Sequence, residues 1–229
     1  MPFLHQKSPS AIYEAAFVQK LFASMSASYE RMNTITSFGF SNRWRRQCVR
    51  ELGLKPGQVV VDLMAGMGET WDYICERIGT EGTIVSVDFC EQMLQYADRK
   101  RKRTSFALYN TKLIQQDVLA GTLPVQSADH IVIAVGLKTL NEDQISLLAR
   151  EVRRVLKPGG QFSCIEVSVP EPVVPRTLYF STFNTLSLCL VLCFWAIQKH
   201  TACSVRIRFN LKIANGQRNC SLTKDYNAG

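Results

Sequence analysis

Short apolar runs alternate with segments of helical periodicity along most of the chain, and such runs are typical of buried strands. They predict strands at Gln58–Asp62, Thr83–Asp88, Lys112–Gln116, His130–Val135 and Gln161–Glu166. The periodic segments predict helices, among them Ile12–Met25, Asn42–Leu52, Glu91–Arg99 and one that is stopped by Lys157–Gly160. Strands that alternate with helices predict an α/β fold with a mostly parallel, doubly wound sheet and a ligand at its carboxyl edge.

The first strand breaks into a glycine turn, Asp62–Glu69, with the sequence D-L-M-A-G-M-G-E. Gly66 and Gly68 flank one residue, but no third glycine follows at the position that dinucleotide-binding loops require. Glu69 would repel a pyrophosphate, whereas an acidic loop suits a ligand with a cationic centre and no phosphate. S-adenosylmethionine is the leading candidate. The expected cofactor contacts in this turn are Asp62, Ala65, Gly66, Met67 and Gly68.

Two further carboxylates follow predicted strands. Asp88 ends the second strand about 20 residues after the glycine turn, where doubly wound folds place an acidic residue on the ribose hydroxyls. The alternative role for Asp88 is an N-cap of the helix Glu91–Arg99, and both roles can hold at once. Asp117 follows the third strand, where its carboxylate can accept from an exocyclic amine while Val118 packs on a purine. The alternative for Asp117 is a plain turn residue.

Composition agrees with one enzyme-sized domain. With 229 residues, 46% of them hydrophobic, the chain can bury a full core. The eight cysteines show no metal-site spacing, so no metal is expected and the thiols are interpreted as reduced. The first residues lack an apolar segment of signal-peptide length, which favours an intracellular protein.

The net charge of +8 is concentrated near the C-terminus. Residues 198–229 hold six Lys and Arg against one Asp, which leaves +3 for the rest of the chain. Two other basic clusters, Arg43–Arg46 and Arg99–Arg103, lack the interleaved aromatic residues or recognition module of a nucleic-acid face. The second cluster is most simply a solvated helix end, where cations suit the helix dipole. No nucleic-acid partner is therefore expected.

Three segments resemble the ubiquinone/menaquinone biosynthesis C-methyltransferases. Residues 154–168, R-V-L-K-P-G-G-Q-F-S-C-I-E-V-S, fill every defining position of the family's second signature. The first signature is recognisable at Tyr29–Asn33, Ser37, Gly39 and Trp44–Arg45, with departures at Glu30, Thr36 and Ser41, where the family usually has Asp, an aliphatic residue and His. Ala134–Thr139 resembles the turn after the fourth strand, usually S-F-G-L-R-N. The resemblance covers roughly residues 17–184.

The resemblance implies a Rossmann-like class I methyltransferase that uses S-adenosylmethionine. Its expected substrate is a polyprenylated benzoquinol or naphthoquinol precursor, methylated at a ring carbon. The family's cofactor contacts carry over onto Met67, Asp88, Asp117, Val118 and Ala134. Met67 replaces a usual Thr and Ala134 a usual Ser, and each lost hydrogen bond costs about 1 kcal/mol.

No catalytic base can be named, because the nucleophile is the ring carbon activated by its own phenolate. Alignment and a cavity of the right charge then supply most of the catalysis. Tyr29 and Asn33 are candidate substrate contacts, with helix packing as the alternative.

The family pattern ends near Thr185, although a methyltransferase of this class needs two more strands. Back-translated with permitted codons and read two bases later, residues 195–205 give G-N-P-E-T-Y-R-M-L-G, which resembles a segment that some relatives carry there. We therefore expect an N-terminal helical segment (1–52), a cofactor-binding α/β domain (53–184) and a poorly ordered, frameshifted tail (185–229). The rival interpretation is a membrane anchor at Leu178–Ile197, which is uncharged and long enough to span a bilayer but is weakened by Asn184.

These expectations leave several functional classes open. The first is a quinol C-methyltransferase, cytoplasmic or peripheral to a quinone-containing membrane. The second is a cofactor-binding but inactive protein, either truncated or a structural partner in a quinone-biosynthesis assembly. The third is an O-methyltransferase that acts on a small aromatic or lipid molecule.

Overall fold

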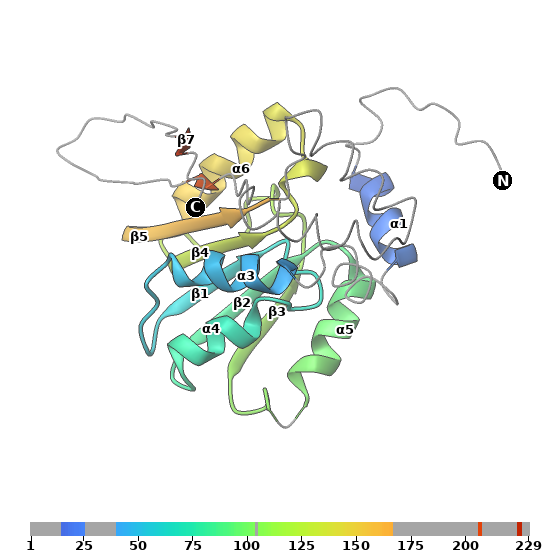
Figure 1. Ribbon diagram of the computed structural model, residues 1–229. Helices are drawn as coiled ribbons and strands as arrows, with labels where there is room; N and C mark the ends of the chain where they lie inside the picture. Colours follow the sequence, from blue (N-terminus) through green and yellow to red (C-terminus); the bar gives the residue numbers. More distant parts are fainter. Residues whose placement is uncertain (1–14, 26–39, 104, 167–205, 208–223, 226–229) are drawn as a thin grey trace, which may run out of the picture.

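The computed structural model describes residues 15–25, 40–103, 105–166, 206–207 and 224–225 (Figure 1). Within them, five parallel strands form one sheet in the order β3-β2-β1-β4-β5, which confirms the predicted Rossmann-like sheet. The strands are β1 Val59–Leu63, β2 Thr83–Asp88, β3 Asn110–Gln115, β4 Ala128–Ala134 and β5 Leu156–Ile165. A separate antiparallel pair joins β6 Arg206–Ile207 to β7 Lys224–Asp225. The rest of the 185–229 tail and the segment Leu178–Ile197 lie outside the described residues.

Helices cover both faces of the sheet (Figure 1). They are α1 Ala15–Met25, α3 Phe40–Arg50, α4 Trp71–Ile78, α5 Glu91–Arg101 and α6 Glu142–Val155, with a short 3-10 turn η2 at Leu137–Thr139. One core lies between the sheet and α3, α4 and α5, and includes Val60 and Val132. The other lies against α6 and includes Val61 and Ile133. Alternate residues of each strand therefore enter opposite cores, as a doubly wound sheet requires.

The parallel register brings the carboxyl ends of the central strands to one edge. Asp62 of β1 pairs with Ser86 of β2 and with Val132 of β4. Strand β1 therefore lies between β2 and β4, and the chain leaves β1 and β4 toward opposite sides of the sheet. Ligands of open α/β folds bind at this switch point, outside the carboxyl ends of the strands.

Strand β5 begins earlier than its apolar run predicts. Helix α6 ends at Val155 and β5 starts at Leu156 rather than Gln161. Pro158 disfavours helical geometry at Lys157. The pairing with β4 shifts register between Ala128 and His130, which accommodates this extra length. The other predicted bounds differ slightly, since α3 begins at Phe40 and α5 ends at Arg101.

Trp71 anchors α4 to the sheet. Its indole N–H donates to Ser86 Oγ at 2.7 Å, and both residues are fully buried. The ring also meets Phe106 edge-on, with 6.2 Å between centroids. A buried donor and a buried acceptor thus satisfy one another directly beneath the glycine turn.

The described residues show the state of four cysteines and the lengths of the helices. Cys48, Cys75, Cys90 and Cys164 are buried and free, in agreement with reduced core thiols. No helix in the described part of the chain combines the length and apolar character needed to cross a bilayer.

Replacing Trp71 with Phe should lower the free energy of unfolding by about 1–3 kcal/mol, because buried Ser86 Oγ loses its partner. Ser86→Ala is the matched variant, and urea denaturation of both single variants and the double variant completes a cycle. The double variant should be about 1 kcal/mol more stable than additivity predicts. Strictly additive losses would show that the indole–hydroxyl bond does not stabilise the fold.

Candidate functional site

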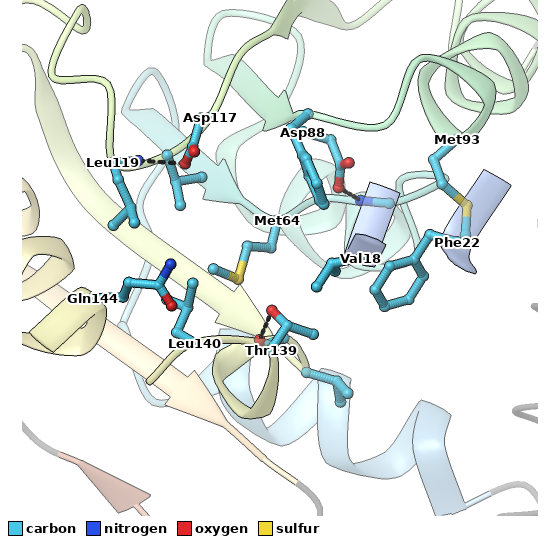
Figure 2. A pocket seen from close by; sticks show the side chains of 15 residues that line it. Val18, Phe22, Met64, Asp88, Met93, Asp117, Leu119, Thr139, Leu140 and Gln144 are labelled. Carbon is cyan, nitrogen blue, oxygen red and sulfur yellow. Dashed lines mark hydrogen bonds between the residues drawn. The ribbon is translucent and has the colours of Figure 1, made fainter. Parts of the chain in front are cut away.

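A cleft lies at the carboxyl edge of the sheet (Figure 2). The turns after β1, β2, β3 and β4 contribute to it, together with α1, η2 and the start of α6. Its lining includes Val18, Phe22, Met64, Gly66, Asp88, Asp117, Val118, Val135, Gly136 and Gln144. The cleft therefore lies at the switch point, where ligands of this fold class bind.

The backbone N–H groups of the glycine turn are already bonded within the protein. Gly66 N donates to Asp88 Oδ2 at 2.8 Å and Met67 N donates to Glu69 Oε2 at 3.0 Å. Gly68 N donates to the Ala65 carbonyl at 2.9 Å. In dinucleotide-binding folds these donors bind phosphate oxygens. In this turn two carboxylates and a carbonyl take that place, so no phosphate cradle is formed by Gly66–Gly68.

Each carboxylate oxygen of Asp88 accepts a hydrogen bond from a backbone N–H group. Its Oδ1 accepts from Cys90 N at 2.9 Å, while Oδ2 accepts from Gly66 N. The side chain is only 6% exposed, and this burial raises the pKa of its carboxyl group above the ordinary value. Cys90, rather than Asp88, is the N-cap residue of α5, so the alternative N-cap role is wrong.

Asp62 is buried below the turn, on the face of the sheet that α4 covers. Thr70 Oγ1 donates to Asp62 Oδ2 at 2.6 Å, and the residue is 1% exposed. Burial raises the pKa of Asp62 to about 7, with smaller contributions in the same direction from Glu69 and Asp88. At neutral pH the Asp62 carboxyl group is therefore divided between its protonated and ionised forms, because its buried site stabilises the negative charge poorly.

Glu69 folds back over the glycine turn. Burial raises the pKa of its carboxyl group, and the nearest compensating cation is Arg45 of α3, whose Nη2 lies 3.8 Å from Glu69 Oε1. Arg45 is itself 4% exposed. Lys100 of α5 donates to the Gly68 carbonyl and to Asp72 Oδ2, both at 2.8 Å. Arg45 of α3 and Lys100 of α5 thus both contact the acidic glycine turn.

At the end of β3 the chain turns into the cleft. Asp117 is exposed, and its Oδ1 accepts from Leu119 N at 2.9 Å (Figure 2). This contact is the turn role that the sequence left open, and Asp117 also lines the cleft beside Val118. Either role is compatible with the geometry.

The remaining predicted contacts do not line the cleft. Met67 packs with Cys90 and Met93, and Ala134 packs against the core beneath α3. Asp62, Ala65 and Gly68 also lie behind its surface. Tyr29 and Asn33 lie outside the described residues. The cofactor roles of all these residues remain predictions.

Two non-glycine residues at the cleft adopt the left-handed backbone conformation. Met64 follows β1 with φ +55°, and Val135 follows β4 with φ +70°. This conformation costs a non-glycine residue about 1–3 kcal/mol, and a β-branched residue rarely adopts it. Both line the cleft on either side of the switch point. Apolar side chains at strand ends carry no sequence signal for such strain, so neither was predicted.

The sequence profile of the ubiE/COQ5 methyltransferase family matches residues 10–189. The chain belongs to this family. Demethylmenaquinone methyltransferase of Listeria welshimeri is 36% identical over 153 residues, which are 67% of this chain and 63% of that protein. The corresponding protein of Geobacillus stearothermophilus is 33% identical over 167 residues, 73% of this chain and 70% of its own length. The chain thus spans less than two thirds of the Listeria relative.

Solved structures of distant sequence share this fold. Haemonchus contortus phosphoethanolamine N-methyltransferase 1, in complex with S-adenosylhomocysteine, superposes with a TM-score of 0.58 at 15% identity, over 72% of this chain and 34% of that one. The DhpI–SAH complex gives 0.52 at 18% identity, over 66% and 67%. The sheet of this ubiE/COQ5 family member is therefore the class I methyltransferase sheet that its sequence predicted.

The Asp62→Asn variant should alter how stability depends on pH. Because the folded-state pKa is raised to about 7 from 3.8, the folded protein keeps a proton that the unfolded chain loses between those values. Asp62 therefore makes unfolding easier as the pH rises from about 4 to about 7, by on the order of a few kcal/mol. The free energy of unfolding of Asp62→Asn, measured by urea denaturation across that range, should not show this decline.

Asp143→Asn, which changes an exposed carboxylate of α6, is the control and should keep the wild-type decline. A decline that is equally steep in Asp62→Asn would show that Asp62 ionises normally in the folded protein.

Proposed function

We propose that this chain is an S-adenosylmethionine-dependent C-methyltransferase whose acceptor is a polyprenylated quinol. The observation that carries the proposal is the set of carboxylates around the glycine turn. They occupy the N–H groups of Gly66 and Met67 and place acidic groups beside the cleft and behind it. A phosphate-bearing cofactor would meet repulsion and find no donors there. A ligand with a cationic centre meets attraction.

The raised pKa values of Asp62, Glu69 and Asp88 support the same choice. Each shows that burial makes the bare carboxylate costly in the folded protein. A cation near the turn would stabilise the ionised forms, as a neighbouring positive charge does for any carboxylate. S-adenosylmethionine carries a sulfonium and an ammonium group and has no phosphate, so the residues present fit it.

Each described residue would then hold a different part of the cofactor. Asp88 stands at the end of β2, where the ribose hydroxyls are bound in this fold class. Asp117 and Val118, at the end of β3, suit the amine and the face of the adenine. The glycine turn and Ala134 itself are proposed to hold the amino-acid portion. When bound, the cofactor supplies an electrophilic methyl group on its sulfonium.

The remaining work of the protein is alignment and exclusion of water. Val18 and Phe22 of α1, together with Leu140 and Met64, give the cleft apolar walls (Figure 2). Such walls suit an aromatic ring with a prenyl chain, and they keep water from the electrophile. A ring carbon activated by its own phenolate needs no strong base from the protein, so positioning supplies most of the acceleration.

The acceptor is proposed to be a naphthoquinol. The names of the Listeria and Geobacillus relatives favour it over the benzoquinol alternative. Peripheral contact with a quinone-containing membrane follows from the apolar acceptor, and Tyr29 and Asn33 are proposed as its further contacts.

Cofactor binding should depend on Asp88. Calorimetry should show S-adenosylmethionine or S-adenosylhomocysteine binding to the wild type, with affinity reduced roughly ten- to a hundredfold in Asp88→Asn through loss of charge-assisted hydrogen bonds. Glu81→Gln removes an exposed carboxylate just before β2, at the amino edge of the sheet, and should bind like the wild type. Binding of NAD in place of S-adenosylmethionine would sink the proposal.

Methyl transfer from labelled S-adenosylmethionine should be seen with a short-chain demethylmenaquinol, and the product should carry the new methyl group on carbon. A methyl ether as product would favour the O-methyltransferase alternative. Tight cofactor binding with no transfer to any quinol would favour the inactive alternative.

A further inference from the structure

Glu166 bridges two strands at the edge of the cleft. It follows β5, and its Oε2 accepts from Gly136 N at 3.0 Å and from Lys138 N at 3.2 Å. Both donors belong to the turn after β4, defined here as the β4 turn, Val135–Thr139. Three of its residues, Val135, Gly136 and Thr139, line the cleft. One carboxylate oxygen therefore holds a wall of the cleft from behind.

The β4 turn needs such a support because its geometry is strained. Val135 is left-handed, at φ +70°, and a β-branched side chain opposes that conformation. Gly136 packs so closely on Met64 that an added Cβ would lie 2.6 Å from the Met64 sulfur. Inside the turn, Thr139 N and Oγ1 both donate to the Gly136 carbonyl. Those bonds shape the turn but do not connect it to the sheet.

Two contacts connect the β4 turn to β5. Val135 N donates to the Ile165 carbonyl at 2.9 Å, which continues the strand ladder. Beyond Val135, Gly136 N and Lys138 N donate to the Glu166 carboxylate instead of to a backbone carbonyl of β5. Strain of this kind persists only where the surroundings over-determine it.

The β4 turn lies across the cleft from the proposed cofactor carboxylates. Figure 2 shows Met64 between Asp88 and Asp117 on one side and Thr139 and Leu140 on the other. Asp88 and Asp117 follow β2 and β3, whereas the β4 turn belongs to the opposite half of the sheet. On the proposed function, the wall held by Glu166 lies opposite the residues that would hold the ribose and the adenine.

We propose that Glu166 is a positioning residue, which fixes the β4 turn as the acceptor-facing wall and so sets the alignment of the methyl acceptor. The assignment rests on the proposed methyltransferase function. Displacing a wall by about 1 Å costs an aligned reaction roughly a hundredfold in rate, while a cofactor held mainly by the other half of the cleft keeps its affinity.

Asp129 offers a matched control at the opposite edge of the same sheet. Its Oδ2 accepts from Val59 N at 2.8 Å, and Lys157 Nζ donates to its Oδ1 at 2.8 Å. Asp129 thus ties strands together by the same kind of bond, but at their amino ends, away from the cleft. A loss that is merely structural should appear in both places.

The experiment compares Glu166→Leu, Glu166→Gln and Asp129→Leu in the full chain. Amide hydrogen exchange at Gly136 and Lys138 should accelerate about tenfold or more in Glu166→Leu and return close to wild type in Glu166→Gln, which keeps an acceptor oxygen. With a short-chain demethylmenaquinol, kcat should fall roughly ten- to a hundredfold in Glu166→Leu. The Kd for S-adenosylhomocysteine should stay within about threefold. Asp129→Leu should lower Tm yet keep kcat.

Each other outcome overturns the assignment. Unchanged exchange at Gly136 and Lys138 in Glu166→Leu would show that the carboxylate does not hold the turn. An equal loss of S-adenosylhomocysteine affinity would place the wall in the cofactor half. The same fall in kcat for Asp129→Leu would reduce the effect to general destabilisation. If the wild type neither binds S-adenosylhomocysteine nor transfers methyl, the proposed function itself is wrong. Amide hydrogen exchange at Gly136 and Lys138 then still tests whether Glu166 holds the turn.

Discussion

The cleft depends on the pair of hydrogen bonds that Asp88 accepts from Gly66 N and Cys90 N. A carboxylate as buried as Asp88 is costly unless its oxygens are satisfied, and these two N–H groups satisfy one on each oxygen. The same bonds attach the turn after β1 to the start of α5. The position of the glycine turn, and hence the shape of the cleft floor, follows from the need to pair one buried charge.

The acidic character of this turn also explains contacts made far from the cleft. Because Glu69 bends inward, a compensating cation has to be buried near it, and Arg45 of α3 supplies that charge. The Met67 side chain is apolar and packs with Met93. The hydroxyl that the family usually has there is thus exchanged for apolar packing between α1 and α5. Arg45, one of the residues that carry the family resemblance, thus connects α3 to the glycine turn.

The sequence predicted the sheet because buried parallel strands are nearly uniform apolar runs. It also predicted that Asp88 and Asp117 lie at the ligand-binding edge, because the carboxyl ends of parallel strands share one edge of the sheet. Other features depend on tertiary contacts that no local pattern encodes. Glu166 and Gly136 are 30 residues apart and meet only through the pairing of β4 with β5. The early start of β5 was missed because Lys157–Gly160 resembles a loop.

The electrostatics of the turn link ligand binding to the stability of the fold. Asp62, Glu69 and Asp88 all have pKa values raised by burial, so the folded protein bears a cost for their negative charge. A cation that binds beside the turn removes part of that cost, and the free energy so released adds to its affinity. A neutral demethylated product, which lacks the sulfonium charge, gains less. On the proposed function, the sulfonium of the substrate cofactor would interact more favourably with these carboxylates than the uncharged thioether of the product.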